Sequence, residues 1–201
     1  MTNHRILHVC LASSYMTGYM YQENLLPLYH KHSGAEVLVI ANCTDYDKGR
    51  VIEKPPGSYE DRGIPILRID RLLASVKILR YLRIYKDVFD TICDFRPSII
   101  FMHDAQFWNT QQIRRYLKKF PNTLLFVDCH TDEGNSATNA ISKWVLHKVY
   151  FKWRISLLRK YVQHWWAVLP RRKDFLMEYY SIEEKDISYL PLGYDDLNLV
   201  E

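Results

Sequence analysis

Seven short apolar segments recur along the chain, and each has the length of a β-strand. They are Ile6–Ala12, Glu36–Ala41, Ile64–Ile69, Ser98–His103, Thr123–His130, His164–Leu169 and Ile187–Leu192. Some are apolar at every position of a stretch, as in Val37–Ile40, which is typical of strands buried on both faces of a sheet. Such strands belong to parallel sheets that helices cover, so the pattern predicts a mainly parallel sheet of about seven strands.

The segments between these strands carry apolar residues three and four positions apart, which predicts amphipathic helices. The helices are expected within Tyr19–Ser33, Leu72–Asp94, Trp108–Phe120, Thr138–Tyr161 and Arg171–Tyr180. Pro27 lies inside the first, where we expect a kink or an interruption. Asn42–Arg62 is predicted to be a long excursion at one edge, with a short extra strand near Val51–Glu53. Alternating strands and helices predict an α/β fold, a doubly wound sheet with helices on both faces.

Composition narrows the class of protein. The chain has 201 residues, of which 48% are apolar, with a formal net charge of +4. This apolar fraction is enough for a core and excludes a disordered chain. The longest unbroken apolar runs are five residues, whereas a membrane-spanning helix needs about 20. Charged and polar residues interrupt the N-terminus from His4 onward, so we expect no signal peptide and a cytoplasmic protein. The four cysteines include no C-x-x-C pair, which argues against a disulfide framework or a metal cluster.

Polar residues gather where predicted strands end. In open α/β sheets, ligands bind beyond the carboxyl ends of the strands, where the strand order reverses. With the common order 3-2-1-4-5-6, the loops after the first, fourth and fifth strands flank one crevice. Ordinary loop capping is the alternative for each residue taken singly. The candidates in these loops are Tyr15, Thr17, Gly18, His103, Asp104, His130, Asp132, Glu133 and Asn135.

Several common sites are disfavoured. The first loop lacks G-x-G-x-x-G and the chain lacks a Walker A loop, which argues against a nicotinamide dehydrogenase and a P-loop NTPase. A single glycine, Gly18, precedes the first predicted helix, and a phosphate can approach a helix N-terminus there. An unrelated Rossmann-like nucleotide-binding protein is therefore an alternative interpretation. No three of His103, Asp104, His130 and Asp132 are close in sequence, and we predict no metal and no cofactor.

The positive charge is concentrated in one segment. Residues Gly134–Lys173 contain nine Lys and Arg, no acidic residue and four of the five tryptophans, whereas the rest of the chain has a balance of −5. A basic helix with large aromatics resembles one that lies on an anionic lipid surface at the inner face of the plasma membrane. A solvated basic face is the alternative, and nucleic acid is not predicted as a partner. The membrane-facing candidates are Lys143, Lys148, Lys152, Arg159 and Lys160.

Several segments, spread over the whole chain, together resemble the motifs of one enzyme family. Arg96–Asp104 is similar to a "KPDIIHVHD" type of segment, Phe126–Asp132 to a strand that carries an active-site histidine, and Leu190–Asp195 to a P-x-G-x-D segment that leads into a second domain. The remaining similar segments are Arg5–Val9, Thr17-Gly18, Tyr21–Pro27 and Gly34–Val37. In this order and spacing, the segments resemble the N-terminal domain of GT-B glycosyltransferases, specifically glycosyltransferase family 4.

The resemblance implies a hexosyltransferase-type enzyme that moves a sugar, with retention and without a metal. The donor would be a nucleotide-sugar and the acceptor a glycan or a lipid-linked molecule, in bacterial capsule or lipopolysaccharide biosynthesis. By position, His130 corresponds to the catalytic histidine near the donor sugar, and Thr17 and Gly18 correspond to the turn at the donor diphosphate. The acceptor side would be lined by Tyr15, His103, Asp104, Asp132, Glu133 and Asn135.

Two departures from the family pattern matter. The family often has two glycines where this chain has Thr17-Gly18, and the glutamate pair of its C-terminal nucleotide-sugar domain is absent. We therefore expect residues 1–193 to form the acceptor-side domain, residues 194–201 to begin a linker, and the isolated chain to be inactive. The alternative is a stand-alone Rossmann-like binding module that docks on an anionic membrane.

Overall fold

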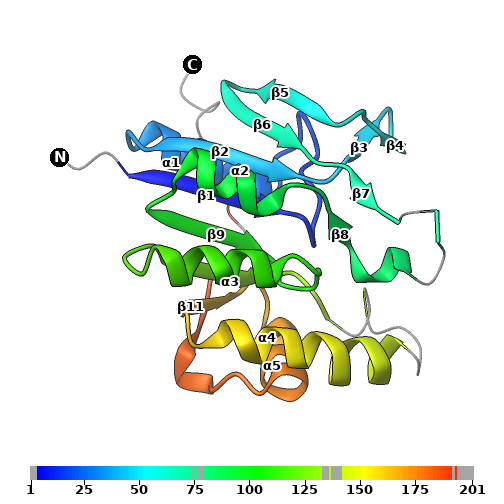
Figure 1. Ribbon diagram of the computed structural model, residues 1–201, viewed down its shortest axis with the longest axis vertical. Helices are drawn as coiled ribbons and strands as arrows, with labels where there is room; N and C mark the ends of the chain where they lie inside the picture. The colour runs from blue at the N-terminus through cyan, green and yellow to red at the C-terminus, as the bar shows by residue number, and fades with distance from the viewer. Residues whose placement is uncertain are drawn as a thin grey trace.

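The computed structural model describes residues 4–73, 75–76, 79–132, 136, 142–191 and 193, without the side chains of residues 79, 80, 142 and 143. An eight-stranded sheet runs through the molecule in the order β12-β11-β10-β9-β1-β2-β6-β5 (Figure 1). Seven strands are parallel, and they match the seven predicted segments. They are β1 (Arg5–Cys10), β2 (Glu36–Ala41), β6 (Ile64–Arg68), β9 (Ile99–His103), β10 (Leu124–Cys129), β11 (Val162–Ala167) and β12 (Ile187–Tyr189).

The eighth strand and a hairpin come from the excursion between β2 and β6. β3 (Thr44–Asp47) and β4 (Arg50–Glu53) pair antiparallel, which confirms the short strand expected near Val51–Glu53. β5 (Gly57–Asp61) then joins the main sheet antiparallel to β6. The excursion therefore extends one edge of the sheet.

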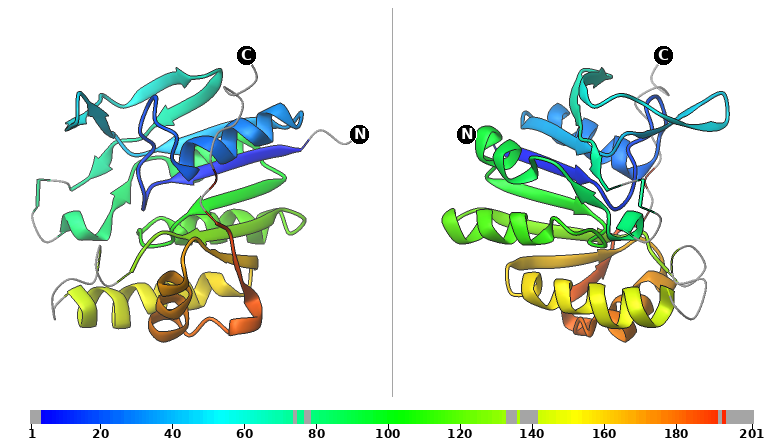
Figure 2. Two further views of the ribbon diagram at one scale, coloured as in Figure 1. Left: turned by 180° about the vertical axis from the view of Figure 1, so that it is seen from behind. Right: turned by 45° about the vertical axis from the view of Figure 1, so that its right-hand side comes forward.

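Helices cover both faces of the sheet, as predicted. α1 (Gln22–His32) packs on β1, β2 and β6 and lies in front of the sheet in the rear view of Figure 2. The opposite face carries the largest hydrophobic cluster, which joins Leu7, Val127 and Trp165 of the sheet to the remaining helices. Those helices are α2 (Val88–Phe95), α3 (Thr110–Lys119), α4 (Lys152–Arg159) and α5 (Pro170–Tyr180). In the described parts of the chain, no helix has the length and apolarity that a membrane crossing requires.

The helix expected within Leu72–Asp94 is wrong for most of its length. This stretch contains η1 (Leu79–Leu82) and the pair formed by β7 (Arg71–Leu72) and β8 (Ile84–Tyr85), before α2 begins at Val88. Arg83 and Asp87 have positive φ angles, which a helix does not tolerate. The Asn109 side chain bonds both the N–H and the carbonyl of Tyr85, so tertiary contacts override the helical pattern.

Two other helix predictions need adjustment. α1 continues through Pro27 without an interruption. The helix expected within Thr138–Tyr161 consists of a π-helical segment, η2 (Ser142–Phe151), followed by α4. Residues 138–141 of that prediction lie outside the described residues, as do residues 194–201 of the predicted linker.

A buried ion pair fastens the loop after β1 to the excursion. Arg68 of β6 and Asp45 of β3 both have fully buried side chains, and their charged atoms lie 2.8 Å apart. Asp45 also accepts hydrogen bonds from the Thr17 N–H and the Thr17 hydroxyl, and Lys54 lies 2.6 Å away. Burial would raise the pKa of Asp45, but the bonds from Lys54 and Thr17 lower it to about 2. A charged Asp45 therefore holds the loop in place.

We predict that Asp45→Asn lowers the free energy of unfolding by about 3–5 kcal/mol, because it leaves the buried Arg68 charge without its counter-ion. Urea unfolding monitored by circular dichroism measures the loss. The control is Glu36→Gln, which breaks the exposed Arg5–Glu36 pair and should cost less than about 1 kcal/mol. Equal losses in the two variants would contradict a structural role for Asp45.

Candidate functional site

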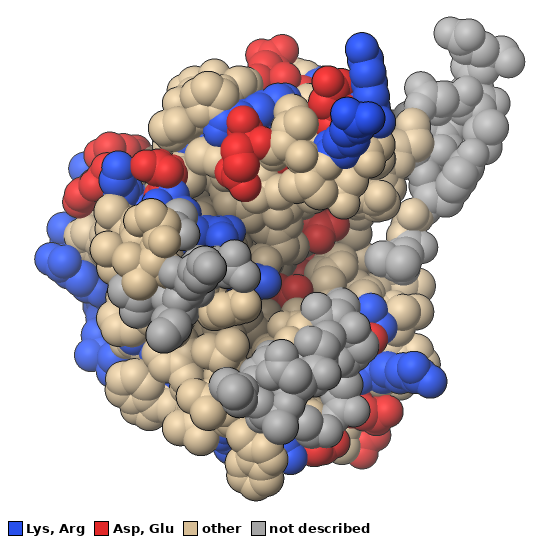
Figure 3. Space-filling model, turned by 90° about the vertical axis from the view of Figure 1, so that its right-hand side faces the viewer, with Lys and Arg blue, Asp and Glu red and all other residues tan. Residues whose placement is uncertain are grey.

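The carboxyl ends of β1, β9 and β10 meet at one edge, because these strands are parallel neighbours. The strand order reverses at β1. The chain continues from β1 to β2 and β6 on one side of β1, and then returns to β9 on the other side of β1. Figure 3 looks onto this edge and shows it hollowed, with acidic groups visible inside the hollow. The sequence placed its candidate site at this edge.

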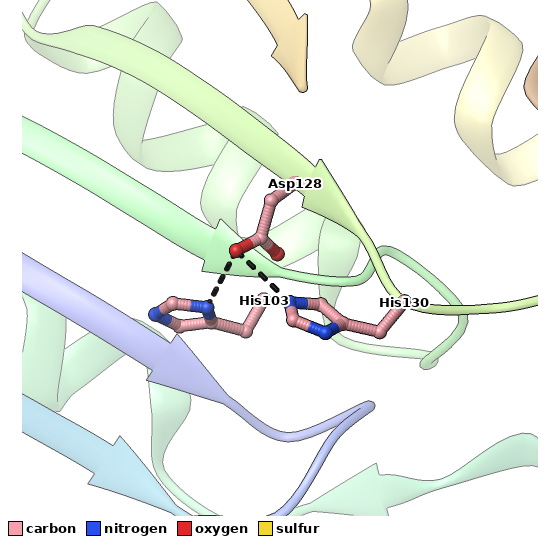
Figure 4. A group of neighbouring side chains, drawn as sticks. All are labelled: His103, Asp128 and His130. Carbon is pink, nitrogen blue, oxygen red and sulfur yellow. Dashed lines mark hydrogen bonds and ion pairs between the residues drawn. The ribbon is translucent and has the colours of Figure 1, made fainter. Parts of the chain in front are cut away.

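Two histidines and an aspartate form the centre of the site (Figure 4). His103 ends β9, Asp128 lies in β10 and His130 follows β10, and both rings point toward the carboxylate. Asp128 Oδ2 lies 2.8 Å from His103 Nδ1 and 3.1 Å from His130 Nε2. The side chains of His103 and Asp128 are fully buried, whereas that of His130 is 18% exposed. His130 is therefore the member of the group that a ligand can reach.

The carboxylate sets the charge on His130. Burial would raise the pKa of Asp128, but His103 and His130 outweigh burial and hold that pKa well below its usual value. Burial would likewise lower the pKa of His130, but Asp128, with Glu23 and Asp104, raises it to about 10. Near neutral pH, His130 is thus an imidazolium beside a buried anion.

His130 opens into a pocket of about 510 Å³. The N-terminal turn of α1 contributes Tyr21, Gln22 and Glu23, and Glu23 Oε1 lies 3.9 Å from His130 Nδ1. The Gln22 side chain is buried, and neither its amide oxygen nor its amide nitrogen has a hydrogen-bond partner. The other lining residues are Ser14, Met16, Met20 and Gly193. The pocket therefore presents a cation, an anion and an amide group beside apolar side chains.

Asp104 is a structural residue of this edge. It is buried, and its carboxylate accepts hydrogen bonds from the His130 N–H and from the Thr131 hydroxyl. Burial raises the pKa of Asp104, and the charge of His130 opposes that effect. Asp104 thus fixes the backbone that carries His130, and His103 is likewise buried away from the pocket surface.

The loop after β1 is tied down by carboxylates. The N–H of Gly18, whose φ is +77°, donates to Asp61 Oδ2 at 3.1 Å, and the buried Tyr15 donates its hydroxyl to the same oxygen. The Thr17 N–H donates to Asp45. The amides predicted to meet a donor diphosphate therefore bond to protein carboxylates in this structure.

The loop after β10 is only partly described. Asp132 forms an ion pair with Arg172 at the start of α5, and Arg172 Nε also donates to the carbonyl of His130. Glu133 and Asn135 lie outside the described residues. A cation from α5 therefore steadies the segment that follows His130.

Among the described residues, His103, Asp128 and His130 offer one group of ligand atoms close enough to share a metal ion, all within 4.8 Å of one another. A hydrogen bond from His103 and an ion pair from His130 to the carboxylate account for the arrangement without an ion. The absence of a metal requirement stays a prediction.

Sequence analysis missed Gln22, Glu23 and Asp128 of this site, and it missed His8 and His30, whose rings continue the line of contacts from His103. Asp128 stands two positions before His130, so the alternation of a strand places both side chains on one face. His8 is a polar residue inside an apolar strand, a signal that could have been used. Glu23 and His30 belong to α1, and nothing in the sequence shows which strands that helix covers.

Comparisons with known proteins establish the fold. No protein-family model matches the sequence, and a search of curated proteins finds no similar protein. A solved structure of a glycosyltransferase from Rickettsia africae ESF-5 is 14% identical over 95% of this chain and 43% of its own, with a TM-score of 0.47. An E. coli trehalose-6-phosphate protein bound with UDP-2-fluoro glucose is 9% identical over 97% of this chain and 50% of its own, with a TM-score of 0.52.

The E. coli structure shares the Rossmann-like α/β architecture of this chain, so the predicted fold class is confirmed. At such low identity the likeness shows the fold alone. The chain spans half or less of the length of the two solved structures.

The charge on His130 predicts a loss of stability in alkali. Because its pKa rises from 6.5 to about 10 on folding, His130 stabilises the fold fully below pH 6.5, and this contribution disappears as the pH approaches 10. Asp128→Asn should flatten this part of the stability profile, since it removes the anion that raises the pKa. Chemical unfolding from pH 6 to pH 10 measures both profiles. Parallel slopes for the wild-type protein and Asp128→Asn would refute the pairing.

Proposed function

We propose that this chain is the acceptor-side domain of a glycosyltransferase that takes sugar from a nucleotide-sugar donor. The observation that carries the proposal is the position of His130, which contacts the buried Asp128 and faces a pocket at the strand-order reversal of a Rossmann-like sheet. The fold is shared with an E. coli structure that binds UDP-2-fluoro glucose. Ligands of such sheets bind at this edge.

The pocket suits a hydroxylated ring better than a free anion. His130 and Glu23 bring opposite charges to it, and Gln22 brings an amide whose polar atoms are unpartnered. A sugar hydroxyl both donates and accepts hydrogen bonds, so it can satisfy a carboxylate, an imidazolium and an amide at once. The exposed apolar surfaces of Met20 and Tyr21 can pack against the ring carbons.

His130 is the residue we propose for catalysis. Glycosyl transfer develops negative charge on the departing diphosphate, and an N–H donor already held in place stabilises such charge without reorganisation. An imidazolium with a pKa of about 10 keeps its proton at neutral pH, so His130 acts as a hydrogen-bond donor. Retention, a hexosyl donor, a family 4 assignment and a cytoplasmic role in surface polysaccharide assembly belong to the same proposal.

A second domain completes the proposed enzyme. The chain spans 50% of the E. coli structure, which supports a longer functional unit. Thr17 and Gly18 stay the proposed donor-side turn, and a diphosphate that binds the Gly18 N–H would replace Asp61 there. The proposed acceptor side has Glu23 and Gln22 at the pocket, with Tyr15, His103, Asp104 and Asp132 in support.

We predict that His130→Ala lowers turnover about 100-fold in the longer protein with both domains, because a preorganised donor to the leaving group is lost. The assay follows release of nucleoside diphosphate from a panel of nucleotide-sugars with glycan and lipid-linked acceptors. His32→Ala, an exposed change on α1, is the control. Unchanged turnover in His130→Ala would remove His130 from the reaction, and an equal rate for the isolated chain would overturn the need for a second domain.

Membrane docking is a second candidate function, and exposed apolar side chains favour it. Trp144, Val145, Val149 and Trp153, of η2 and α4, are each more than half exposed. Lys148 lies 5.3 Å from the centre of the Trp144 ring and 3.3 Å from the carboxylate of the exposed Glu178, and Lys152 is half-buried nearby in sequence. Apolar side chains beside lysines fit the boundary of an anionic bilayer. We call Trp144, Val145, Lys148, Val149, Lys152 and Trp153 the docking face.

The other lysines and arginines predicted to face the membrane are less suited. Arg159 pairs with Glu183 and donates to the carbonyl of Ser181, so its charge is engaged within the protein. Lys160 is exposed at the end of α4, and the side chain of Lys143 is not described. The docking face therefore carries the membrane proposal.

We predict that Trp144→Ser combined with Trp153→Ser weakens binding to anionic vesicles about ten-fold or more, because two aromatic side chains no longer enter the interface. Co-sedimentation with vesicles that contain or lack phosphatidylglycerol measures binding. Lys118→Gln with Lys119→Gln removes two exposed charges at the end of α3 and is the control. Equal binding to both kinds of vesicle by the wild-type protein would exclude this surface as a membrane contact.

A further inference from the structure

Three histidines continue the site centre toward helix α1. His103 Nε2 lies 3.1 Å from His8 Nδ1, and His8 Nε2 lies 3.0 Å from His30 Nδ1. His8 and His103 are fully buried, whereas His30 is only half-buried. We call His30, His8 and His103 the histidine row. With Asp128 it forms an unbroken line of hydrogen-bonding atoms from the outer part of α1 to the candidate site.

The rings of the row lie edge to edge. The ring centres of His8 and His103 are 5.3 Å apart with an angle of 18° between planes, and those of His8 and His30 are 5.1 Å apart with an angle of 33°. Each centre-to-centre distance is close to the sum of one N···N contact and two ring radii, which requires both nitrogens to lie near the line that joins the ring centres. An N–H in the plane of one ring therefore meets a lone pair in the plane of the next, which is good hydrogen-bond geometry.

The direction of these bonds follows from Asp128. With one proton on each ring, His103 donates its Nδ1–H to Asp128, because a carboxylate only accepts, and its Nε2 then offers a lone pair. That lone pair needs the Nδ1–H of His8, whose Nε2 then needs the Nδ1–H of His30. All three N–H groups point toward Asp128, and the last lone pair belongs to Nε2 of His30.

The surroundings favour the neutral forms of His8 and His30. The Phe101 ring contacts all three imidazoles, with centre-to-centre distances of 5.1 to 6.4 Å. Burial, with His103 and His30 as neighbours, lowers the pKa of His8 well below its usual value, against the opposing charge of Asp128. Burial and His103 also lower the pKa of His30. A proton that reaches His30 or His8 is therefore bound less tightly there than on an ordinary histidine.

We propose that the histidine row is a proton relay between solvent at His30 and the carboxylate of Asp128. A proton binds His30 Nε2, and the Nδ1 proton of His30 moves to His8 Nε2. The Nδ1 proton of His8 then moves to His103 Nε2, and the Nδ1 proton of His103 moves to Asp128 Oδ2. One proton enters, one carboxyl O–H forms, and every ring is again neutral in the opposite tautomer.

The relay controls the charge at the pocket. When Asp128 is protonated, His130 loses the anion that stabilises its imidazolium and can release its own proton to the pocket. The reverse sequence returns a proton from Asp128 to solvent at His30. The titratable groups that face the line come from each element around it: Glu23 and His30 from α1, His8 and Cys10 from β1, His103 and Asp104 from β9 and its loop, and Asp128 and His130 from β10 and its loop.

The test uses this chain alone and needs no substrate, so its result is independent of sugar transfer. NMR of protein labelled with ¹⁵N-histidine measures how fast the ring N–H protons of His8 and His103 exchange with water. His30→Asn is the informative variant, because the Asn amide N–H can replace the Nδ1–H of His30 but cannot take up and pass on a proton. We expect exchange of both ring protons to slow about ten-fold or more relative to the backbone amides of β1.

The ratio to the β1 amides separates the relay from altered stability, since local unfolding speeds ring and backbone exchange together. His32→Asn, on the exposed side of the same helix, should leave the ratio as in the wild-type protein. If the histidine row is only a static hydrogen-bonded filling, His30→Asn preserves its bond and the ratio stays unchanged. That result would overturn the relay.

Discussion

A carboxylate buried away from water needs donors or cations beside it, and Asp128 receives both at Oδ2, from His103 and His130. With one proton on each ring, it fixes the direction of every hydrogen bond in the histidine row, and it stabilises the positive charge of His130. The tautomer and the rotamer of His103 and of His130 therefore both depend on Asp128. The chemistry available at the pocket is therefore determined by a residue that no ligand can touch.

A second buried carboxylate serves a different purpose. Asp45 is neutralised by Arg68 and Lys54 and binds the backbone of the loop that borders the pocket. The excursion from β3 to β5 thus does more than extend the sheet, because it determines the shape of the loop between β1 and α1. Two buried carboxylates thus fix neighbouring parts of this edge: Asp128 contacts His130, and Asp45 binds the loop after β1.

The sheet was predicted well from the sequence. Its central strands are short, largely apolar segments separated by turn residues, a pattern typical of buried parallel strands. It missed β5, whose residues Gly57–Asp61 are mostly polar, since an edge strand in contact with water carries no apolar signal. The helix predicted within Leu72–Asp94 was wrong for a different reason. The apolar residues of this stretch have helical spacing, but hydrogen bonds from the Asn109 side chain help to determine its backbone conformation. For the site, His103 and His130 were found because they stand at strand ends. His30 was not, because its place depends on how α1 crosses the sheet.

Asp104 combines two demands that few amino acids meet together. Its φ of 64° lies in the left-handed region, which favours glycine, asparagine and aspartate, and its two carboxylate oxygens each accept a bond from the segment that carries His130. Glycine adopts the left-handed conformation but has no side-chain acceptor. Glutamate has two acceptor oxygens but disfavours that conformation, and asparagine has only one acceptor oxygen. Distant relatives of this chain should therefore be easier to recognise by an aspartate after β9 than by overall identity.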